Sequence, residues 1–246
     1  MKKIVTLIIL FVALAYGCNS DSDSSSIDTP TDGQGGSLAV FVLKGDYLYT
    51  VDQTDLNVFS LVDPSGPVKV NELSVGFNIE TLYSDADYLY IGSQNGMYIY
   101  NIANPENPLY VSAAQHVTAC DPVVSNGTHA YVTIHASTGC GGSTNALLVY
   151  DLTNPSDPQL VHQRNLTSPK GLGLYGNYLL VCDDEIKIFD ITNPDEPVLS
   201  AAINKYCNDI IIRDNTLFAI GDQAIYRYTL NPNDIGNAVF VSELFF

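Results

Sequence analysis

Positive charge is scarce in this sequence of 246 residues. Lys and Arg together number 10 against 27 Asp and Glu, which gives a formal net charge of −17 at pH 7. Nucleic-acid binding needs a basic surface that neutralises phosphates, so DNA and RNA are not expected partners.

The sequence also contains no Trp, and its aromatic content rests mainly on 16 Tyr. A tyrosine ring can be buried while its hydroxyl reaches a polar partner, which suits packed strands.

Several motifs of common enzyme classes are also missing. The sequence has no nucleophile elbow, no phosphate-cradling Gly-rich loop, no zinc-protease helix and no EF-hand pattern. Sustained helical periodicity is absent beyond the N-terminal apolar run. We therefore expect no catalytic residues of these classes and no resident cofactor.

The N-terminus indicates export. Met1–Lys3 is positively charged, and the apolar run Ile4–Ala15 is too short to span a bilayer as a stable helix but has the length of a signal peptide. Leu14–Cys18 resembles the lipobox of bacterial lipoproteins, which implies cleavage before Cys18 and lipidation of that residue. An ordinary secretory signal followed by a coincidental cysteine is the alternative.

The next segment predicts a tether. Asn19–Asp23 resembles the acidic tag that sends lipoproteins of Bacteroidetes-type bacteria to the cell surface. Residues 20–37 are rich in Ser, Asp, Thr and Gly and cannot bury much apolar area. We thus expect a signal peptide at 1–17, a lipidated tether at 18–37 and a folded domain at 38–246. The lipid would anchor the protein to the outer membrane at the cell surface, as its only contact with the membrane.

A strand–turn unit recurs five times in the expected folded domain. Its turn is clearest at Asn104–Pro108, Asn154–Pro158 and Asn193–Pro197, with degenerate copies at Asp63–Pro67 and Asn231–Asp234. Asn followed by Pro favours a type I turn. The first prolines are 41, 50, 39 and 38 residues apart. Repeats of about 40 residues rich in short strands are typical of β-propellers.

Each unit holds four apolar strands separated by turn residues. Leu147–Asp151 precedes a turn and Ala130–Val132 lies before it, while Ile79–Tyr83 and Leu109–Val111 exemplify the leading and trailing strands. The third strand is apolar on both faces, as sheets covered on both sides require. A proline opens the fourth strand, which predicts an outer edge. The sequence therefore predicts an all-β fold, a five-bladed β-propeller of four-stranded antiparallel blades.

These units resemble the LVIVD repeat of bacterial and archaeal surface proteins, named for its third-strand pentad. Leu147–Pro155 is the best match, and Ile186–Pro194 is nearly as good. The first and last copies depart from the pattern, with Ser60 and Thr229 at the Asp position. The resemblance implies a propeller at the cell surface and carries over no catalytic residue.

Four cysteines follow Cys18: Cys120, Cys140, Cys182 and Cys207. An even number in an exported chain favours disulfides. On a propeller Cys120 and Cys140 fall on one face, as do Cys182 and Cys207, so we predict these two pairs. A zinc site is the alternative, and an oxidising envelope disfavours it. Its ligands would be His116, Cys120, His135 and Cys140.

One position in each unit predicts a ring at a mouth of the central channel. Alignment of the units places there Ala39, Glu80, Asp121, Lys170 and Asn208. Four of these five are polar or charged, which is costly in a buried strand. The longer loop Ala136–Asn145 and the acidic run Asp183–Glu185 belong to the same face.

We predict that six residues of this face contact a ligand: Glu80, Asp121, Lys170, Asn208, Asp183 and Asp184. The alternative is that the ring residues satisfy backbone groups where strands begin. The run Asp183–Glu185 is interpreted as a solvated turn rather than a Ca²⁺ site.

The expected function is a non-enzymatic binding or interaction module, monomeric, with a propeller face as the platform for a glycan, peptide or envelope partner. The alternative is a carbohydrate-active hydrolase that uses paired carboxylates at the propeller mouth. Such enzymes build deep pockets from long loops, whereas most connections in this sequence have only a few residues. The sequence therefore favours binding and does not identify the ligand.

Overall fold

The computed structural model describes residues 35–116, 122–136 and 142–246. All of them belong to one compact unit, Asp32–Phe246. The described residues form β-strands joined by turns and loops, with no helix long and apolar enough to cross a membrane.

The strands form five four-stranded sheets, which we number as blades in chain order. Blade one holds β1 (Phe41–Lys44), β2 (Tyr47–Val51), β3 (Asp55–Ser60) and β4 (Val68–Ser74). Blade two holds β5 (Ile79–Asp85), β6 (Tyr88–Ser93), β7 (Gly96–Asn101) and β8 (Leu109–Gln115). Blade three holds β9 (Val123–Ser125), β10 (His129–Ile134), β11 (Ala146–Asp151) and β12 (Gln159–Asn165). Blade four holds β13 (Leu172–Tyr175), β14 (Tyr178–Cys182), β15 (Ile186–Asp190) and β16 (Val198–Ile203). Blade five holds β17 (Asp209–Arg213), β18 (Thr216–Ile220), β19 (Ala224–Thr229) and β20 (Val239–Phe245).

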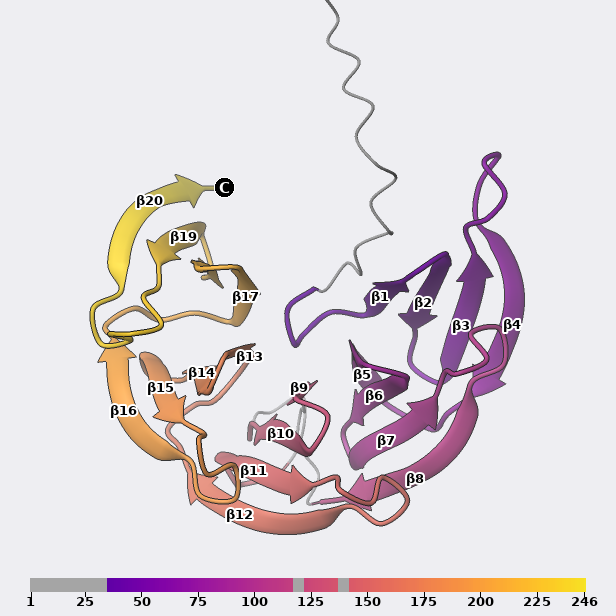
Figure 1. The fold of residues 1–246 in the computed structure, drawn as a ribbon, viewed down its shortest axis with the longest axis horizontal. Helices are drawn as coiled ribbons and strands as arrows, with labels where there is room; N and C mark the ends of the chain where they lie inside the picture. Colours follow the sequence, from indigo (N-terminus) through magenta and orange to yellow (C-terminus); the bar gives the residue numbers. More distant parts are fainter. Residues whose placement is uncertain (1–34, 117–121, 137–141) are drawn as a thin grey trace, which may run out of the picture. The chain divides into compact units, whose positions relative to one another are not determined.

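Every blade is antiparallel and follows the chain from its innermost to its outermost strand (Figure 1). This confirms the predicted five-bladed β-propeller. The predicted edge strands are also confirmed, because Pro108, Pro158 and Pro197 each stand directly before the outermost strand of a blade. Each blade carries one register shift between its third and fourth strands, such as that between Val149 and Tyr150. A β-bulge bends and twists the bulged strand.

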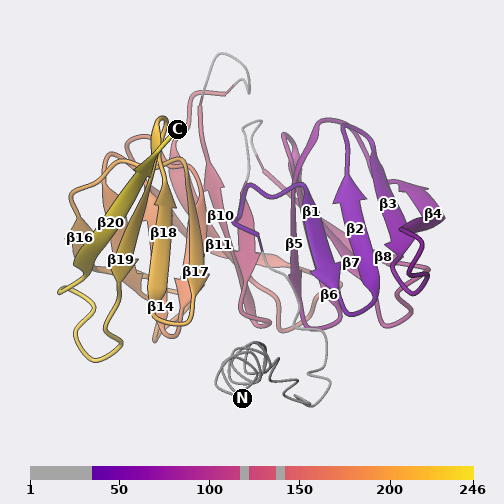
Figure 2. The same cartoon turned by 90° about the horizontal axis from the view of Figure 1, so that it is seen from above.

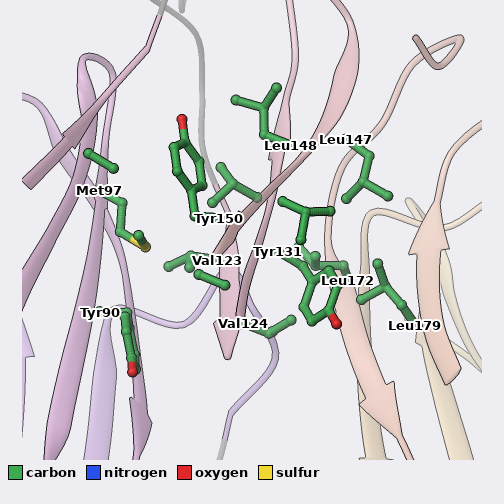
Figure 3. Packing of buried hydrophobic residues seen from close by; sticks show 14 of the residues in the cluster. Tyr90, Met97, Val123, Val124, Tyr131, Leu147, Leu148, Tyr150, Leu172 and Leu179 are labelled. Carbon is green, nitrogen blue, oxygen red and sulfur yellow. The ribbon is translucent and has the colours of Figure 1, made fainter. Parts of the chain in front are cut away.

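The core lies between blades, in three apolar clusters. The largest joins blades two, three and four and includes Tyr90, Tyr131 and Leu179 (Figure 3). A second joins blades four and five, and a third joins blades one and two. Both faces of the inner blades are therefore covered, as the apolar character of both strand faces predicts.

In blades two, three and four, the turn between the third and fourth strands docks on the preceding blade. The hydroxyl of Tyr49 in blade one donates to the carbonyl oxygen of Pro105 at 2.9 Å. Ser112 of blade two donates in the same way to Pro155 at 2.6 Å, and Arg164 of blade three to Pro197 at 3.0 Å. His129 of blade three is buried and bonds Asp195 of the next blade's turn at 2.8 Å.

The arc of blades is open between blade five and blade one. The innermost strands of successive blades pack against one another in the order β1, β5, β9, β13 and β17. Among the described residues, no strand of blade five makes extensive contact with a strand of blade one. None of the three apolar clusters joins these two blades. In Figures 1 and 2 the two blades stand apart at the ends of the arc.

A strap of residues 35–40 enters the centre of the arc before β1. The Ser37 hydroxyl donates to Asp209 Oδ1 at 3.0 Å and accepts from the Leu172 backbone N–H at 2.8 Å. The Ala39 carbonyl accepts from the N–H of Leu82 at 2.7 Å. Gly36 and Ser37, which the sequence assigns to the tether, are buried, so the propeller includes them.

Candidate functional site

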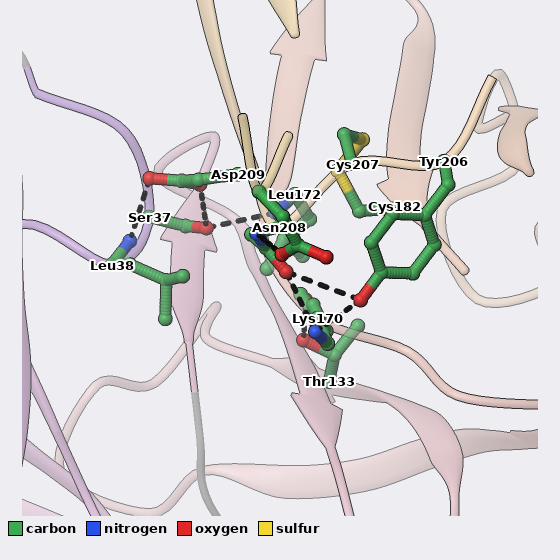
Figure 4. Close-up of a disulfide and its surroundings, with 11 residues drawn as sticks. Ser37, Leu38, Thr133, Lys170, Leu172, Cys182, Tyr206, Cys207, Asn208 and Asp209 are labelled. Carbon is green, nitrogen blue, oxygen red and sulfur yellow. Dashed lines mark hydrogen bonds between the residues drawn. A yellow bond between two sulfur atoms is a disulfide. The ribbon is translucent and has the colours of Figure 1, made fainter. Parts of the chain in front are cut away.

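A disulfide lies at one mouth of the arc and links blades four and five. Cys182 ends β14, and Cys207 precedes β17 with a Cα–Cα distance of 5.3 Å. Both cysteines are fully buried. The predicted Cys182–Cys207 pair is therefore confirmed (Figure 4). The predicted Cys120–Cys140 pair lies outside the described residues.

Backbone hydrogen bonds bring two of the predicted ring residues together. The Lys170 N–H donates to the Cys182 carbonyl at 2.8 Å, which holds Lys170 beside the end of β14. The Gly171 N–H donates to the Asn208 carbonyl at 2.8 Å, so the starts of β13 and β17 are bonded across two blades. Lys170 and Asn208 therefore project next to each other.

Their side chains belong to a polar chain that also contains Tyr206 and Asp222. Lys170 Nζ donates to Asn208 Oδ1 at 2.6 Å and to the Tyr206 hydroxyl, and it stands 5.0 Å from the centre of the Tyr206 ring. Asn208 Nδ2 donates in turn to Asp222 Oδ1 at 2.7 Å. The cation, the phenol and the amide are thus fixed relative to one another at the mouth (Figure 4). The Asp222 carboxylate is held beside them by its bond with Asn208.

A groove of about 510 Å³ adjoins this chain. Its lining residues are Asp184, Asn204, Lys205, Tyr206, Gly221, Asp222, Gln223 and Tyr226. Lys205 Nζ lies 4.1 Å from the centre of the Tyr226 ring, a cation–π contact. Tyr206 is 39% exposed, so its ring is open to a ligand in the groove.

One residue of the acidic run, Asp183, differs from the prediction of a solvated turn. Asp183 is fully buried, and its carboxylate accepts hydrogen bonds from the backbone N–H groups of Thr167 at 3.0 Å and Ser168 at 2.5 Å. It also pairs with Lys187 Nζ at 2.5 Å. Asp183 therefore fixes the loop before β13 and is buried rather than solvated.

Asp184, the next residue, is exposed and reaches the groove. It pairs with Lys187, and the hydrogen bond from that ammonium lowers the pKa of the Asp184 carboxyl. Asp184 therefore stays ionised, as a hydrogen-bond acceptor.

His135 lies on the blade-three side of the same mouth. Thr133, two residues earlier, donates its hydroxyl to the Lys170 carbonyl at 2.5 Å. Burial lowers the pKa of His135, and the positive charge of Lys170 lowers it further, while Asp183 opposes the shift. The imidazole is therefore held neutral beside the ammonium.

Two other ring residues, Glu80 and Ala39, make hydrogen bonds elsewhere. Glu80 accepts a hydrogen bond from Gln94 Nε2 at 2.9 Å within blade two. Ala39 takes part through its backbone carbonyl, in the strap. Asp121 lies outside the described residues, as does part of the Ala136–Asn145 loop.

Sequence reasoning missed Tyr206, Asp222 and Lys205. Tyr206 precedes a disulfide cysteine and Asp222 follows Gly221, so both stand in short loops without a recognisable motif. The alignment of units could have found them, because both loops meet the ring position of blade five. Within the part of the chain that the structure describes, no group of three His, Cys, Asp or Glu side chains is placed to hold a metal ion.

The protein is thus a β-propeller with a cluster of polar residues beside the disulfide that links blades four and five. The model of the LVIVD repeat matches residues 35–73, 85–114 and 169–204. The chain therefore carries LVIVD repeats within a five-bladed propeller, as the resemblance of its third strands implies. Among curated proteins, none matches this sequence.

Solved structures share the fold at low sequence identity. A periplasmic gluconolactonase from Pseudomonas aeruginosa, PpgL, aligns with a TM-score of 0.63 and 13% identity over 81% of this chain and 67% of that chain. The computationally designed protein Ika8 aligns with a TM-score of 0.59 and 10% identity over 83% of this chain and 60% of its own. BamB from Moraxella catarrhalis gives a TM-score of 0.53 and 11% identity over 72% and 52%. These likenesses show the fold alone.

Proposed function

We propose that this protein is a cell-surface lipoprotein and a non-enzymatic binding module that takes a saccharide in the groove beside Tyr206. The observation that carries the proposal is the polar chain from Lys170 through Tyr206 and Asn208 to Asp222, fixed at the edge of a groove of about 510 Å³. Binding sites typically combine concave surface, aromatic area and a few fixed polar groups.

The chemistry of the groove suits a sugar ring. The exposed face of Tyr206 offers apolar area against which the C–H face of a pyranose can pack. Asp184 and Asp222 supply acceptors, and Lys205 and Asn204 supply donors, to hydroxyl groups at the ring edge. The disulfide and the bond between β13 and β17 hold this arrangement in place before a ligand arrives, which reduces the ordering cost of binding.

Binding is favoured over hydrolysis by the state of the carboxylates. A glycosidase needs one carboxylic acid with a raised pKa to protonate the leaving group. The pKa of Asp184 is instead lowered by Lys187, and the Asp222 carboxylate accepts from Asn208 at 2.7 Å. Both groups are therefore suited to accepting hydrogen bonds from hydroxyl groups.

A glycan array followed by titration tests the saccharide site. Tyr206→Ala and Asp222→Ala should each weaken binding of a retained glycan about tenfold or more, the equivalent of about 1.4 kcal/mol. Lys69→Ala, an exposed lysine on β4, should leave binding unchanged. Unaltered affinity in Tyr206→Ala and Asp222→Ala would place the ligand on another surface.

A hydrolase remains the second candidate because carboxylates line the groove and a gluconolactonase shares the fold. A panel of chromogenic glycosides and lactones separates the two functions. Turnover that is abolished by Asp222→Asn would overturn the binding proposal.

The lipoprotein assignment is tested by metabolic labelling with palmitate. Label should be incorporated in the wild-type chain and lost in Cys18→Ala. External protease should remove the labelled protein from intact cells if it faces outward, and label that survives the Cys18→Ala change would refute the anchor.

A further inference from the structure

The two ends of the arc carry faces of the kind that are buried at every internal blade junction. We call the face of a blade that covers the preceding blade its leading face, and the opposite face its trailing face. At each internal junction a trailing face packs on the leading face of the next blade. The trailing face of blade five and the leading face of blade one have no such neighbour among the described residues.

Strand register identifies equivalent residues on the trailing faces. On the second strand, Tyr49, Tyr90, Tyr131 and Leu180 are at most 1% exposed, whereas Phe218 of blade five is only half-buried. On the third strand, the equivalent residues of blades one to four are Val58, Ile99, Val149 and Ile188, all 0% exposed. Blade five has an exposed arginine, Arg227, at this position.

The leading faces show the same contrast. The second-strand residues Leu89, Ala130, Leu179 and Leu217 of blades two to five are 0% exposed. Their equivalent in blade one, Leu48, is only half-buried, as is Phe59 on the adjacent strand. Phe41 on β1 is 48% exposed, whereas its equivalent Leu82 in blade two is 1% exposed.

The turn of blade one is also undocked. The second prolines of the turns in blades two and four, Pro108 and Pro197, are buried against the preceding blade. Pro64 and Pro67 in the turn of blade one are both exposed. The turn and the leading face of blade one therefore resemble those of the blades that pack on a preceding blade. Among the described residues, no blade packs against them.

An internal junction shows how Arg227 can be accommodated. Arg164 on blade three stands 5.3 Å from the ring centre of Phe189 on the leading face of blade four, and it donates to the Pro197 carbonyl in the adjacent turn. Phe59 holds the position of Phe189 in blade one, because both lie opposite the aligned leucine of the second strand. An arginine on a trailing face that meets an aromatic ring and a turn on a leading face is thus a contact this protein already makes.

We propose that the open ends bind a second copy of this chain head to tail, with blade one of one copy on blade five of the other. The two ends are complementary to each other, in apolar area and in the pairing of Arg227 with Phe59. The tether of the same chain is a poor occupant, because residues 20–37 contain only Ile27 as a large apolar residue. A head-to-tail interface of this kind uses two different surfaces, so it closes into a ring or extends into a chain.

Complementary single-face variants give a specific test. Residues 19–246 are secreted to the periplasm without lipid and studied by sedimentation equilibrium. The protein concentration is varied from about 1 to 100 µM, because this range detects the weaker protein interfaces. The wild-type chain should self-associate, with a mass that rises with concentration. Phe41→Asp removes the leading face and Phe218→Asp the trailing face, so each alone should sediment as a monomer.

The mixture of the two variants carries the decisive result. Phe41→Asp retains a trailing face and Phe218→Asp a leading face, so an equimolar mixture should form a dimer and nothing larger. Val198→Asp, on the outer strand of blade four and 57% exposed, should associate like the wild type. Circular dichroism and melting temperature verify that each variant is folded, and Arg227→Glu replaces Phe218→Asp if the latter is not.

Two results would overturn the proposal: a wild-type chain that stays monomeric throughout, or folded single-face variants whose mixture stays monomeric. Loss of association in Val198→Asp would move the contact to the outer strands and also contradict it. The saccharide site at the mouth is independent of this interface, so its variants keep the wild-type mass whichever result is found.

Discussion

At the scale of single residues, Asp209 is closely surrounded by backbone and by hydrogen-bond donors. It is 8% exposed, and its carboxylate accepts from the Ser37 hydroxyl at 3.0 Å and the Leu38 N–H at 3.3 Å. A Cβ added to Gly36 would lie 2.0 Å from Asp209 Oδ2, and one added to Gly171 would lie 2.2 Å from Oδ1. Both positions therefore require glycine, because backbone approaches the carboxylate from two sides.

Ser37→Ala should destabilise the domain by about 1–3 kcal/mol, because it leaves a buried carboxylate and the Leu172 N–H each short of a partner. Urea denaturation measures the loss. Ser74→Ala, at an exposed position on β4, is the control and should change stability little. Equal effects of the two substitutions would mean that the strap does not contribute to stability.

Asp209 should also produce a pH dependence of stability. Burial raises the pKa of this carboxyl above its ordinary value, although hydrogen bonds from the Ile210 backbone and from Ser37 oppose the shift. The folded state therefore binds a proton before the unfolded state does, and stability rises as pH falls from the raised pKa toward 3.8.

The difference in unfolding free energy between wild type and Asp209→Asn isolates this contribution. The wild type should gain stability relative to the variant as the pH is lowered from 7 toward 4. A constant difference, or one that changes in the opposite direction, would show that hydrogen bonds outweigh burial at this site.

At the scale of elements, the strands and turns could be predicted because they are repeated. Short apolar strands and Asn-Pro or Asp-Pro turns occur in each unit, so the signal of one unit is supported by the others. The polar mouth could be predicted only in part. The alignment places Lys170 and Asn208 at equivalent positions, but their pairing depends on a hydrogen bond between β13 and β17. The burial of Asp183 likewise depends on Lys187 and on the loop at Thr167, which no local pattern in the sequence reveals.

The disulfide between β14 and the start of β17 should stabilise the domain by about 3 kcal/mol, since it closes a loop over a separation of 25 residues. Replacing both cysteines by serine, Cys182→Ser with Cys207→Ser, should lower the urea midpoint accordingly. It should also weaken the proposed saccharide binding, because Tyr206, which bonds Lys170, is the residue next to the disulfide cysteine Cys207. The control is the same double variant under reducing conditions. Its urea midpoint should not fall further through loss of the Cys182–Cys207 bond, because that bond is already absent.

At the scale of the whole molecule, the number of blades follows from counting repeats, but the open arc does not. The repeat pattern predicts what each blade covers and leaves the angle between blades undetermined. The apolar character of Phe41 and Phe218 is the same as at internal junctions, so the sequence alone predicts a closed ring of five. The structure differs in that none of the three apolar clusters joins blade five to blade one.

An open arc of nearest-neighbour contacts should be most stable in its middle. Blade three lies within the largest cluster and is covered on both faces, whereas blades one and five are each covered on one face. At concentrations where the chain is monomeric, native-state hydrogen exchange should therefore be slowest in β10 and β11 and faster in β2, β3, β18 and β19. Uniform protection across all five blades would indicate that the ends of the arc are covered in solution.

The strap at residues 35–40 has a mechanical consequence. It is bonded at Ser37 to blades four and five and at Ala39 to blade two before the chain enters β1. Tension applied to the chain ahead of Gly35 would reach these three blades at the centre of the arc before it could peel β1 from the edge of its sheet. In a protein held to a membrane by its N-terminus, a pulling force would then act on the centre of the arc. The first bond to break would be the hydrogen bond between Ser37 and the buried carboxylate of Asp209.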